Sequence, residues 1–256
     1  MTEVLLITGG SRGIGAATAR LAARKGYAVA INYRAAQDQA EALVAEIERG
    51  GGRALAVQAD VASQEQVEAM FRAVDAFGPL AALVNSAGIT LTAQVAEFEQ
   101  GALERLLAIN VVGTLLCCRE AVRRISTRFG GKGGAIVNVS SMAAAIGGRP
   151  GRTAYAASKG AIDSFTIGFA KEVAREGIRV NALRPGMTMT DMTDAVRRDP
   201  ELYASTAATI AMNRCAEPEE MARPILWLLS EEASFISGAL LDGSGGGFMI
   251  GQVASP

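Results

Sequence analysis

Two residues whose side chains can exchange a proton stand four positions apart in the run Tyr155-Ala156-Ala157-Ser158-Lys159. On a helix this spacing places Tyr155 and Lys159 on one face, so the phenol and the ammonium can share a site. A free tyrosine has a pKa of about 10 and is a poor acid–base group at neutral pH. A nearby ammonium stabilises the phenolate, and lowering the pKa by ~3 units requires about 4 kcal/mol. The pair predicts acid–base chemistry at Tyr155, although such a pair taken alone is also compatible with core packing.

The sequence contains no histidine, which makes tyrosine the natural proton donor. Ser-His-Asp and Cys-His mechanisms are therefore excluded, and so are His-ligated zinc and haem. The three cysteines, Cys117, Cys118 and Cys215, form no C-x-x-C pair, so no thiolate zinc site or redox disulfide is expected. Unpaired thiols fit a reducing compartment.

A glycine-rich string follows the first apolar run and opens a helical pattern, with the sequence Thr8-Gly9-Gly10-Ser11-Arg12-Gly13-Ile14-Gly15. Binding a pyrophosphate requires backbone amides at a helix N-terminus that side chains do not obstruct. The string predicts a dinucleotide-binding loop, and the alternative is a plain glycine-rich turn. The expected cofactor contacts in this loop are Gly9, Ser11, Arg12, Gly13, Ile14 and Gly15.

The second apolar run ends in Asn32-Tyr33-Arg34, without the acidic residue that usually binds the adenine ribose of NAD. Arg34, together with Arg12, can instead face a 2′-phosphate, and Tyr33 stands beside it. This pattern favours NADP(H), with NAD as the alternative cofactor. The alternative is that both arginines are solvated surface charges.

Two further strand ends supply candidate cofactor contacts. After the third apolar run, Asp60 and Val61 stand where a carboxylate can reach the adenine amino group. The equal alternative is that Asp60 only starts the helix that follows. After the fourth, the small residues of Asn85-Ser86-Ala87-Gly88 leave room for ribose and phosphate. The expected contacts there are Asn85, Ala87 and Gly88.

Short apolar runs alternate with longer helical patterns along the whole chain. The expected strands span residues 4–8, 28–33, 53–58, 82–85, 135–139 and 179–183, with a short seventh at 240–242. The expected helices span residues 14–25, 37–49, 64–77, 101–128 and 154–176. Continuous apolar strands are typical of a parallel sheet that is covered on both faces. The alternation predicts an α/β fold, a doubly wound parallel sheet, in one domain that covers residues 1–256.

Charge and hydropathy narrow the class of protein. The formal net charge is −1, so a basic surface for nucleic acid is not expected. No apolar run approaches the ~18 residues that a membrane span requires. The N-terminus lacks the basic segment that begins a signal peptide, so no signal peptide is expected. These features predict a cytoplasmic protein that binds neither nucleic acid nor membrane.

Taken in order along the chain, these motifs resemble those of the short-chain dehydrogenase/reductase family. The matching elements are the glycine-rich opening, Asn85-Ser86-Ala87-Gly88, Asn110 inside a long helical pattern, Ser141, Tyr155-x-x-x-Lys159, and Arg184-Pro185-Gly186 after the sixth strand. The resemblance covers essentially the whole chain. It implies a single Rossmann domain with strand order 3-2-1-4-5-6-7 and a homo-oligomer, a tetramer or a dimer.

The resemblance also implies a catalytic tetrad of Asn110, Ser141, Tyr155 and Lys159. In it, Ser141 donates a hydrogen bond to the substrate oxygen, and Lys159 holds the nicotinamide ribose. Asn110 holds a proton-carrying water through its backbone in a kinked helix. The interval from Ser141 to Tyr155 is one residue longer than in many relatives, which leaves Ser140 as the alternative to Ser141.

The segment after the sixth strand resembles the part of the family fold that seats the carboxamide and the phosphate. The matching positions are Pro185, Gly186, Thr188 and Thr190. Residues 188–216 show no clean period and are long for a connection, which indicates a lid or disorder. The resemblance favours a substrate lid at about residues 188–215.

The sequence favours an NADP(H)-dependent carbonyl reductase or alcohol dehydrogenase acting on a small molecule. A 3-oxoacyl-[acyl-carrier-protein] reductase is the runner-up, but such reductases usually carry a basic residue where this chain has Glu176, next to Arg175. A glucose 1-dehydrogenase-like enzyme is a further alternative. A non-catalytic dinucleotide sensor is the least favoured alternative, because such proteins commonly lose the tyrosine or the lysine and this chain has both.

Overall fold

A computed structural model describes residues 2–247 of the chain. Seven parallel strands form one sheet in the order β3-β2-β1-β4-β5-β6-β7, as the resemblance implied. The strands are β1 (Val4–Thr8), β2 (Ala28–Tyr33), β3 (Arg53–Gln58), β4 (Leu80–Asn85), β5 (Gly134–Val139), β6 (Ile178–Pro185) and β7 (Leu240–Gly243). The predicted doubly wound α/β sheet is confirmed.

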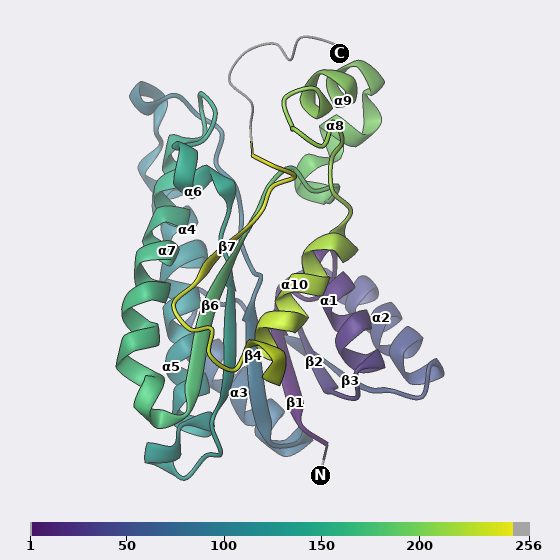
Figure 1. Ribbon diagram of the computed structural model, residues 1–256, viewed down its shortest axis with the longest axis vertical. Coiled ribbons are helices and arrows are strands. Elements are labelled where there is room, and N and C mark those ends of the chain that lie inside the picture. Colours follow the sequence, from purple (N-terminus) through teal and green to yellow (C-terminus); the bar gives the residue numbers. More distant parts are fainter. Residues whose placement is uncertain (1, 248–256) are drawn as a thin grey trace.

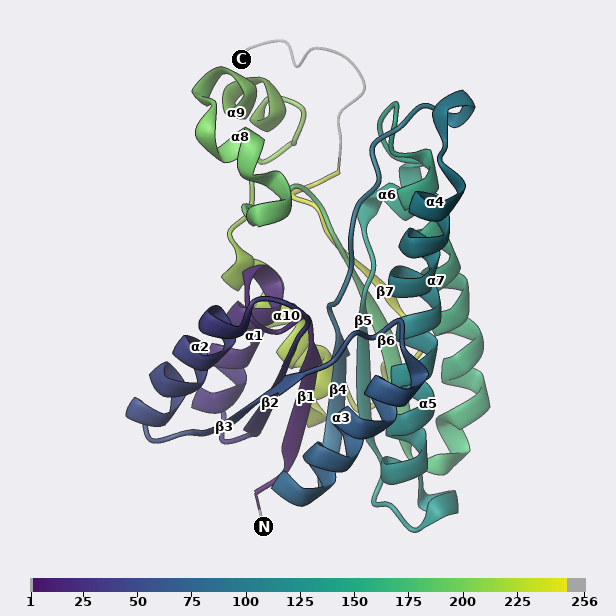
Figure 2. The same ribbon diagram turned by 180° about the vertical axis from the view of Figure 1, so that it is seen from behind.

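Helices cover both faces of the sheet, and the two layers are seen from opposite sides in Figures 1 and 2. One layer contains α1 (Gly13–Arg24), α2 (Gln37–Arg49) and α10 (Pro218–Leu229). The other contains α3 (Gln64–Phe77), α5 (Thr114–Ile125) and α7 (Thr153–Val173). Each helix turns its apolar stripe to the sheet, so two hydrophobic cores form, one on each face.

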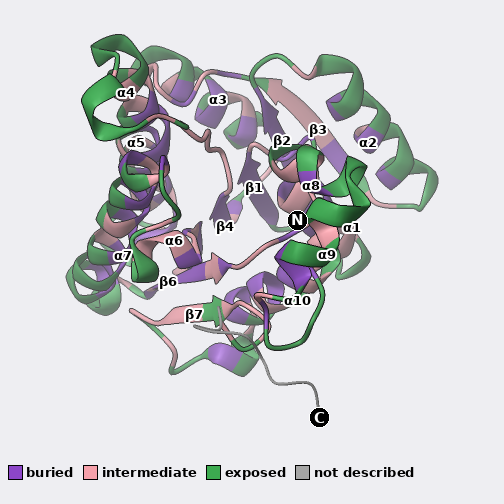
Figure 3. Cartoon of the chain, turned by 90° about the horizontal axis from the view of Figure 1, so that it is seen from above, coloured by how far each residue is buried: buried purple, intermediate pink, exposed green. Residues whose placement is uncertain are grey.

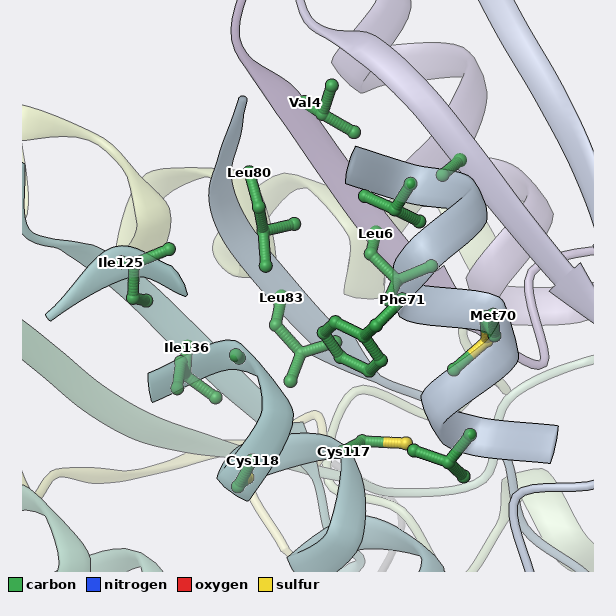
Figure 4. Close-up of a cluster of buried hydrophobic side chains, with 14 of the residues drawn as sticks. Val4, Leu6, Met70, Phe71, Leu80, Leu83, Cys117, Cys118, Ile125 and Ile136 are labelled. Carbon is green, nitrogen blue, oxygen red and sulfur yellow. The ribbon is translucent and has the colours of Figure 1, made fainter. Parts of the chain in front are cut away.

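Alternation along β1 shows how one strand serves both cores. Val4 and Leu6 pack with Phe71 of α3 on one face, whereas Leu5 and Ile7 pack with α1 and α2 on the other. Figure 4 shows the first core, in which Phe71 lies between Leu6, Met70 and Leu83. Because successive side chains of a strand point to opposite faces, every position of β1 is apolar or small and buried.

The predicted helix at residues 101–128 is interrupted. The structure has α4 (Gln100–Leu107), a π-helical segment (Ala108–Gly113) and α5, followed by a short 3₁₀ turn (Thr127–Phe129). A π segment inserts an extra residue into the turn and is often found at functional sites. Asn110, which the resemblance places in a kinked helix, lies in this π segment.

By length and composition, the helical stretch Gln100–Ile125 is long and apolar enough to cross a membrane. This differs from the prediction that no apolar run approaches the length of a membrane span. A core helix of a soluble protein passes the same test. Here Cys117, Ala121 and Ile125 of this stretch are buried against the sheet.

The segment without a clean period folds into two short helices, α8 (Asp194–Arg198) and α9 (Pro200–Ala207). A bridge between Thr188 and Ala216 closes it at its base, and Val196, Ile210 and Cys215 form a small core of its own. The segment stands above the carboxyl ends of the strands, on the side of α1 and α10 (Figures 1 and 2). Viewed from above, much of α9 is exposed, while the central strands are buried (Figure 3).

Candidate active site

The loops that follow the strands line a cavity of about 810 Å³ at the carboxyl edge of the sheet. Ligand pockets are typically 300–1,000 Å³, roughly, and in open parallel sheets they lie at this edge. Most of the predicted site residues line it, namely Gly9, Ser11, Arg12, Gly13, Ile14, Tyr33, Arg34, Asp60, Val61, Ala87, Gly88, Ser141, Tyr155, Lys159, Pro185, Gly186, Thr188 and Thr190. Gly15, Asn85 and Asn110 do not line it.

The glycine-rich loop is packed so closely that side chains are excluded. Gly9 has a φ of 61°, and a Cβ there would lie 2.8 Å from the Cα of Ala87. A Cβ on Gly15 would lie 2.5 Å from the carbonyl oxygen of Gly9. Gly15 therefore supports the loop from behind, and the cradle has the shape that close backbone contact with a pyrophosphate requires.

The N-terminus of α1 opens onto this cradle. The N-cap residue Arg12 makes no side-chain hydrogen bond to the first turn, which contains no acidic residue. The uncapped amides and the positive end of the helix dipole favour a bound anion. The residues present thus fit a dinucleotide phosphate.

Asn32 holds the loop in place and was not identified from the sequence. It is 2% exposed, and its Oδ1 accepts a hydrogen bond from Gly9 N at 3.2 Å. Its Nδ2 donates to the carbonyl oxygen of Ala59 at 3.0 Å. Asn32 thereby ties the glycine loop to the end of β3, a contact that only the folded sheet creates.

At the adenosine end of the cavity, Arg34 is exposed and lines the wall beside the buried Tyr33. No ion pair of Arg34 occurs within residues 2–247. Arg12 forms an ion pair with Asp191 at 3.1 Å, with both side chains more than half exposed. Such a pair contributes little, so both guanidinium groups are available to a phosphate.

Asp60 belongs to a local ion pair. Its Oδ2 lies 2.5 Å from Nη2 of Arg105, and its Oδ1 accepts a hydrogen bond from Ala62 N at 3.0 Å. Burial acts to raise the pKa of Asp60, but these hydrogen bonds and the charge of Arg105 outweigh it and lower the pKa. The N-cap of α3 is Ser63, so Asp60 does not cap this helix, the second of its two predicted roles.

At the end of β4, the Asn85 side chain is buried in the protein, whereas Ala87 and Gly88 line the cavity. The Asn85 side chain is 3% exposed, and its Nδ2 donates to Oδ1 of Asn138 at 2.9 Å inside the protein. Thr8 Oγ1 accepts hydrogen bonds from the backbone N–H of Ser86 and Ala87, at 3.1 and 3.2 Å. Ala87 and Gly88 thus face the cavity, while the Asn85 side chain stabilises the interior.

Asn110 organises the cavity wall from the π segment. Its side chain accepts a hydrogen bond from Ile89 N and donates to Ile89 O, both at 2.9 Å, and donates to Ser158 Oγ at 3.0 Å. Its backbone carbonyl accepts a hydrogen bond from Thr114 Oγ1 at 3.1 Å. The amide therefore joins the loop after β4 to α7, at the residue directly before Lys159.

The two serines at the end of β5 point in opposite directions. Ser140 is 3% exposed and its hydroxyl donates to the carbonyl oxygen of Lys159 at 3.3 Å. Ser141 caps α6 (Met142–Ile146) by accepting a hydrogen bond from Ala143 N at 3.1 Å, and its hydroxyl also hydrogen-bonds the phenol of Tyr155. Both serines line the cavity, but of the two predicted candidates Ser141 is the one whose hydroxyl hydrogen-bonds the phenol of Tyr155.

Lys159 lies beneath Tyr155 on α7 and is 6% exposed. Its Nζ is 5.9 Å from the centroid of the tyrosine ring and donates to the carbonyl oxygen of Val139 at 2.8 Å. Burial lowers the pKa of Lys159 to about 8, and the charge of Asp163 opposes that effect. The predicted pairing of ammonium and phenol on one helical face is present.

The pKa of Tyr155 differs from the expectation. Burial raises it above its ordinary value, and the hydrogen bond with Ser141 and the charge of Arg152 oppose this only in part. The predicted lowering by Lys159 is therefore wrong for this structure. The physical reason is that desolvation of the phenolate dominates, while the ammonium is directed to the Val139 carbonyl.

Asp163 continues the stripe of Tyr155 and Lys159 by one more helical turn. It was not among the site residues predicted from the sequence. It is 7% exposed, and its Oδ2 accepts a hydrogen bond from Arg184 Nε at 2.9 Å. Its Oδ1 has no hydrogen-bond partner within residues 2–247. The spacing of four residues was the available signal, but burial beside Arg184 of β6 depends on the tertiary fold.

A family model described as Enoyl-(Acyl carrier protein) reductase matches residues 9–247. The chain is 47% identical over 245 residues to the uncharacterized oxidoreductase YgfF of Escherichia coli K12, covering 95% of this chain and 99% of that protein. It is 36% identical over 250 residues to the 3-oxoacyl-[acyl-carrier-protein] reductase FabG of Staphylococcus aureus Mu50, covering 97% and 99%. A blue fluorescent protein from a metagenomic library, solved in complex with NADPH, superimposes with a TM-score of 0.87 at 35% identity, covering 95% of this chain and 97% of that one.

The effect of the buried Asp163 charge on Lys159 generates a testable expectation. In Asp163→Asn the pKa of Lys159 falls below about 8, because the negative charge that opposes desolvation is removed. The chain has only four lysines, and Lys25, Lys132 and Lys171 are exposed. NMR of protein labelled at lysine Cε therefore resolves the titration of Lys159 from the other three.

Asp242→Asn is the matched control. Asp242 is the second carboxylate near Arg184, at 3.3 Å, but it is exposed and has no direct effect on Lys159. Its removal should leave the Lys159 titration in place. An unchanged Lys159 pKa in Asp163→Asn would show that the carboxylate does not support the ammonium.

Proposed function

This chain belongs to the short-chain dehydrogenase/reductase family and is an NAD(P)-dependent oxidoreductase, and we propose that it transfers a hydride between NADP(H) and a carbonyl compound or secondary alcohol, with Tyr155 as the acid–base group. The observation that carries the proposal is the juxtaposition of Tyr155, Ser141 and Lys159 in the cavity that also contains the glycine-rich cradle. One ligand can therefore reach both ends.

In the reduction direction, a reduced nicotinamide held in this cavity would supply a hydride for the carbonyl carbon, and the carbonyl oxygen would then need one proton. Tyr155 donates that proton from its phenol, which yields the secondary alcohol and a phenolate. Ser141 donates a hydrogen bond to the same oxygen, where negative charge develops. Lys159 lies beneath the ring, with its Nζ 5.9 Å from the ring centroid, so its ammonium is near the phenol that gives up the proton.

The two pKa shifts suit this direction. A raised pKa keeps Tyr155 protonated at neutral pH, which is the form that donates. A Lys159 ammonium with a pKa of about 8 is more acidic than the phenol, so proton transfer from Lys159 to the phenolate is favourable. Lys159 is thus the source from which Tyr155 is reprotonated, and we propose that Asn110 holds the water of this relay.

The cofactor preference for NADP(H) over NAD is part of the proposal. Supporting it, Arg34 lines the wall directly after Tyr33, where NAD-binding chains usually carry an acidic residue, and the similar blue fluorescent protein was solved with NADPH. The proposed contacts of the phosphate groups are the backbone of the glycine loop, Arg12 and Arg34. Thr188 and Thr190 are proposed to seat the nicotinamide side, and residues 188–215 to act as the substrate lid.

Reduction of 3-oxoacyl-[acyl-carrier-protein] is the second candidate, because the relative FabG carries that name. Glu176 weakens it. Its carboxylate accepts a hydrogen bond from Ser126 Oγ at 2.5 Å and lies 3.8 Å from Nη1 of Arg128. This carboxylate offsets the charge of Arg128, so the position where such reductases usually carry a basic residue adds no attraction for an acidic carrier protein.

We propose a cytoplasmic homo-oligomer, a dimer or tetramer. Supporting this, Leu107, Val112, Leu115 and Ile167 on α4, the π segment, α5 and α7 are 37–48% exposed. Leu106, by contrast, is fully buried. The three cysteines are free thiols, as expected in a reducing compartment.

Removing the phenolic proton donor tests the chemistry. Tyr155→Phe should lower kcat for carbonyl reduction by about 10²–10⁴-fold, because the alkoxide loses its general acid. NADPH binding, followed by fluorescence, should persist. Tyr27→Phe, at the amino-terminal end of β2, is the control and should keep activity. Full turnover in Tyr155→Phe would exclude Tyr155 as the acid.

Removing Arg34 tests the cofactor preference. Wild-type protein should have a lower KM for NADPH than for NADH, and Arg34→Ala should reduce that preference by about tenfold, since a charge-assisted bond contributes about 1.5–3 kcal/mol. Arg24→Ala, at the far end of α1, should leave it unchanged. Equal use of both cofactors by the wild type would contradict the proposal.

A further inference from the structure

Arg152 contacts the cavity wall through Thr90, although it is not itself one of the residues that line the cavity. It directly precedes α7 and is three residues from Tyr155. Its Nη1 donates a hydrogen bond to Thr90 Oγ1, and Thr90 lines the cavity. The guanidinium therefore lies between the start of α7 and the loop after β4, next to the cavity wall and close enough to Tyr155 for its charge to act there.

The charge of Arg152 has no protein counter-ion within residues 2–247. Thr90 is its only side-chain hydrogen-bond partner there, and it takes part in no ion pair. The side chain is half-buried. Burial raises the pKa of Tyr155, and the charge of Arg152 acts in the opposite direction. A partly desolvated cation without a carboxylate partner is unusual, because burial of an unpaired charge is unfavourable.

Among residues 2–247, those that line the cavity near Tyr155 include no carboxylate that would repel an anion. Ile89, Thr90, Val139 and Ser141 are uncharged. The two acidic residues that line the cavity elsewhere are already paired, Asp60 with Arg105 and Asp191 with Arg12. The cofactor phosphates have their own cations at the opposite end, Arg12 and Arg34.

We propose that Arg152 binds an anionic group of the substrate, so that the substrates are oxo acids, carbonyl compounds that carry a carboxylate. A guanidinium has five N–H donors, and the contact with Thr90 uses one. The others are available for a two-pronged bond to a carboxylate while the carbonyl oxygen reaches Tyr155 and Ser141. The inference rests on the proposed function and adds the class of substrate.

The test compares linear 2-, 3- and 4-oxo acids with their methyl esters, which have the same carbonyl without the charge. The kcat/KM ratio of acid to ester is measured with NADPH for wild type, Arg152→Gln and Arg152→Lys. For the best chain length, the ratio should fall at least about tenfold in Arg152→Gln, through loss of acid turnover. Arg152→Lys, which keeps the charge, should retain part of the preference.

Arg175→Gln is the matched control, since Arg175 is an exposed arginine beyond the opposite end of α7. It should leave the ratio unchanged. NADPH binding and the thermal unfolding midpoint report whether each variant is folded. If Arg152→Gln does not fold, Arg152→Lys and the wild-type ratio decide the question.

Three results would overturn the inference. One is that esters are reduced as well as acids, or better, at every chain length. Another is an equal loss for acid and ester in Arg152→Gln, which would mean that Arg152 only holds the Thr90 loop. The third is reduction of neutral ketones alone, which leaves the proposed function intact. Failure to reduce any carbonyl would instead remove the proposed function itself.

Discussion

Lys159 places a positive charge where water scarcely reaches, and the surrounding structure compensates for this. The Val139 carbonyl accepts one of its protons, and Asp163, one helical turn away, supplies the opposing charge. Asp163 in turn is held by Arg184 of β6. The ammonium therefore depends on β5, β6 and α7 being packed in register. Desolvation still lowers the pKa of Lys159 to about 8, and this makes it a usable proton source beside a tyrosine whose own pKa is raised.

The fold brings this charge to a dinucleotide cradle because all seven strands are parallel and their carboxyl ends meet at one edge. Buried amides tie the loops there together. Asn32 holds the glycine loop to β3. Asn110 is buried in the π segment and joins the loop after β4 to α7. Each amide satisfies backbone groups that no strand or helix would otherwise pair. The positions of the cofactor site and the acid–base site are thus linked through polar contacts inside the protein.

The doubly wound sheet, the glycine loop and the pairing of Tyr155 with Lys159 were predictable, because each depends on local spacing and apolar periodicity. Features that depend on neighbours distant in sequence were not. The direction of the Asn85 side chain is decided by Asn138, and the burial of Asp163 by Arg184. The Tyr155 pKa was predicted in the wrong direction, because spacing shows that an ammonium is near but not how far the phenol is desolvated. Arg152 stood unremarked beside Tyr155 because only the structure shows that it lacks a counter-ion.

The most direct test of the central claim is a crystal structure of the complex with NADPH and a bound carbonyl analogue. The account predicts that the nicotinamide lies in the cavity between the glycine loop and α7, with the analogue's oxygen within hydrogen-bonding distance of both Tyr155 Oη and Ser141 Oγ. Lys159 should remain buried beneath the phenol and contact the nicotinamide ribose. A dinucleotide bound elsewhere, or an analogue oxygen beyond the reach of Tyr155, would contradict the account.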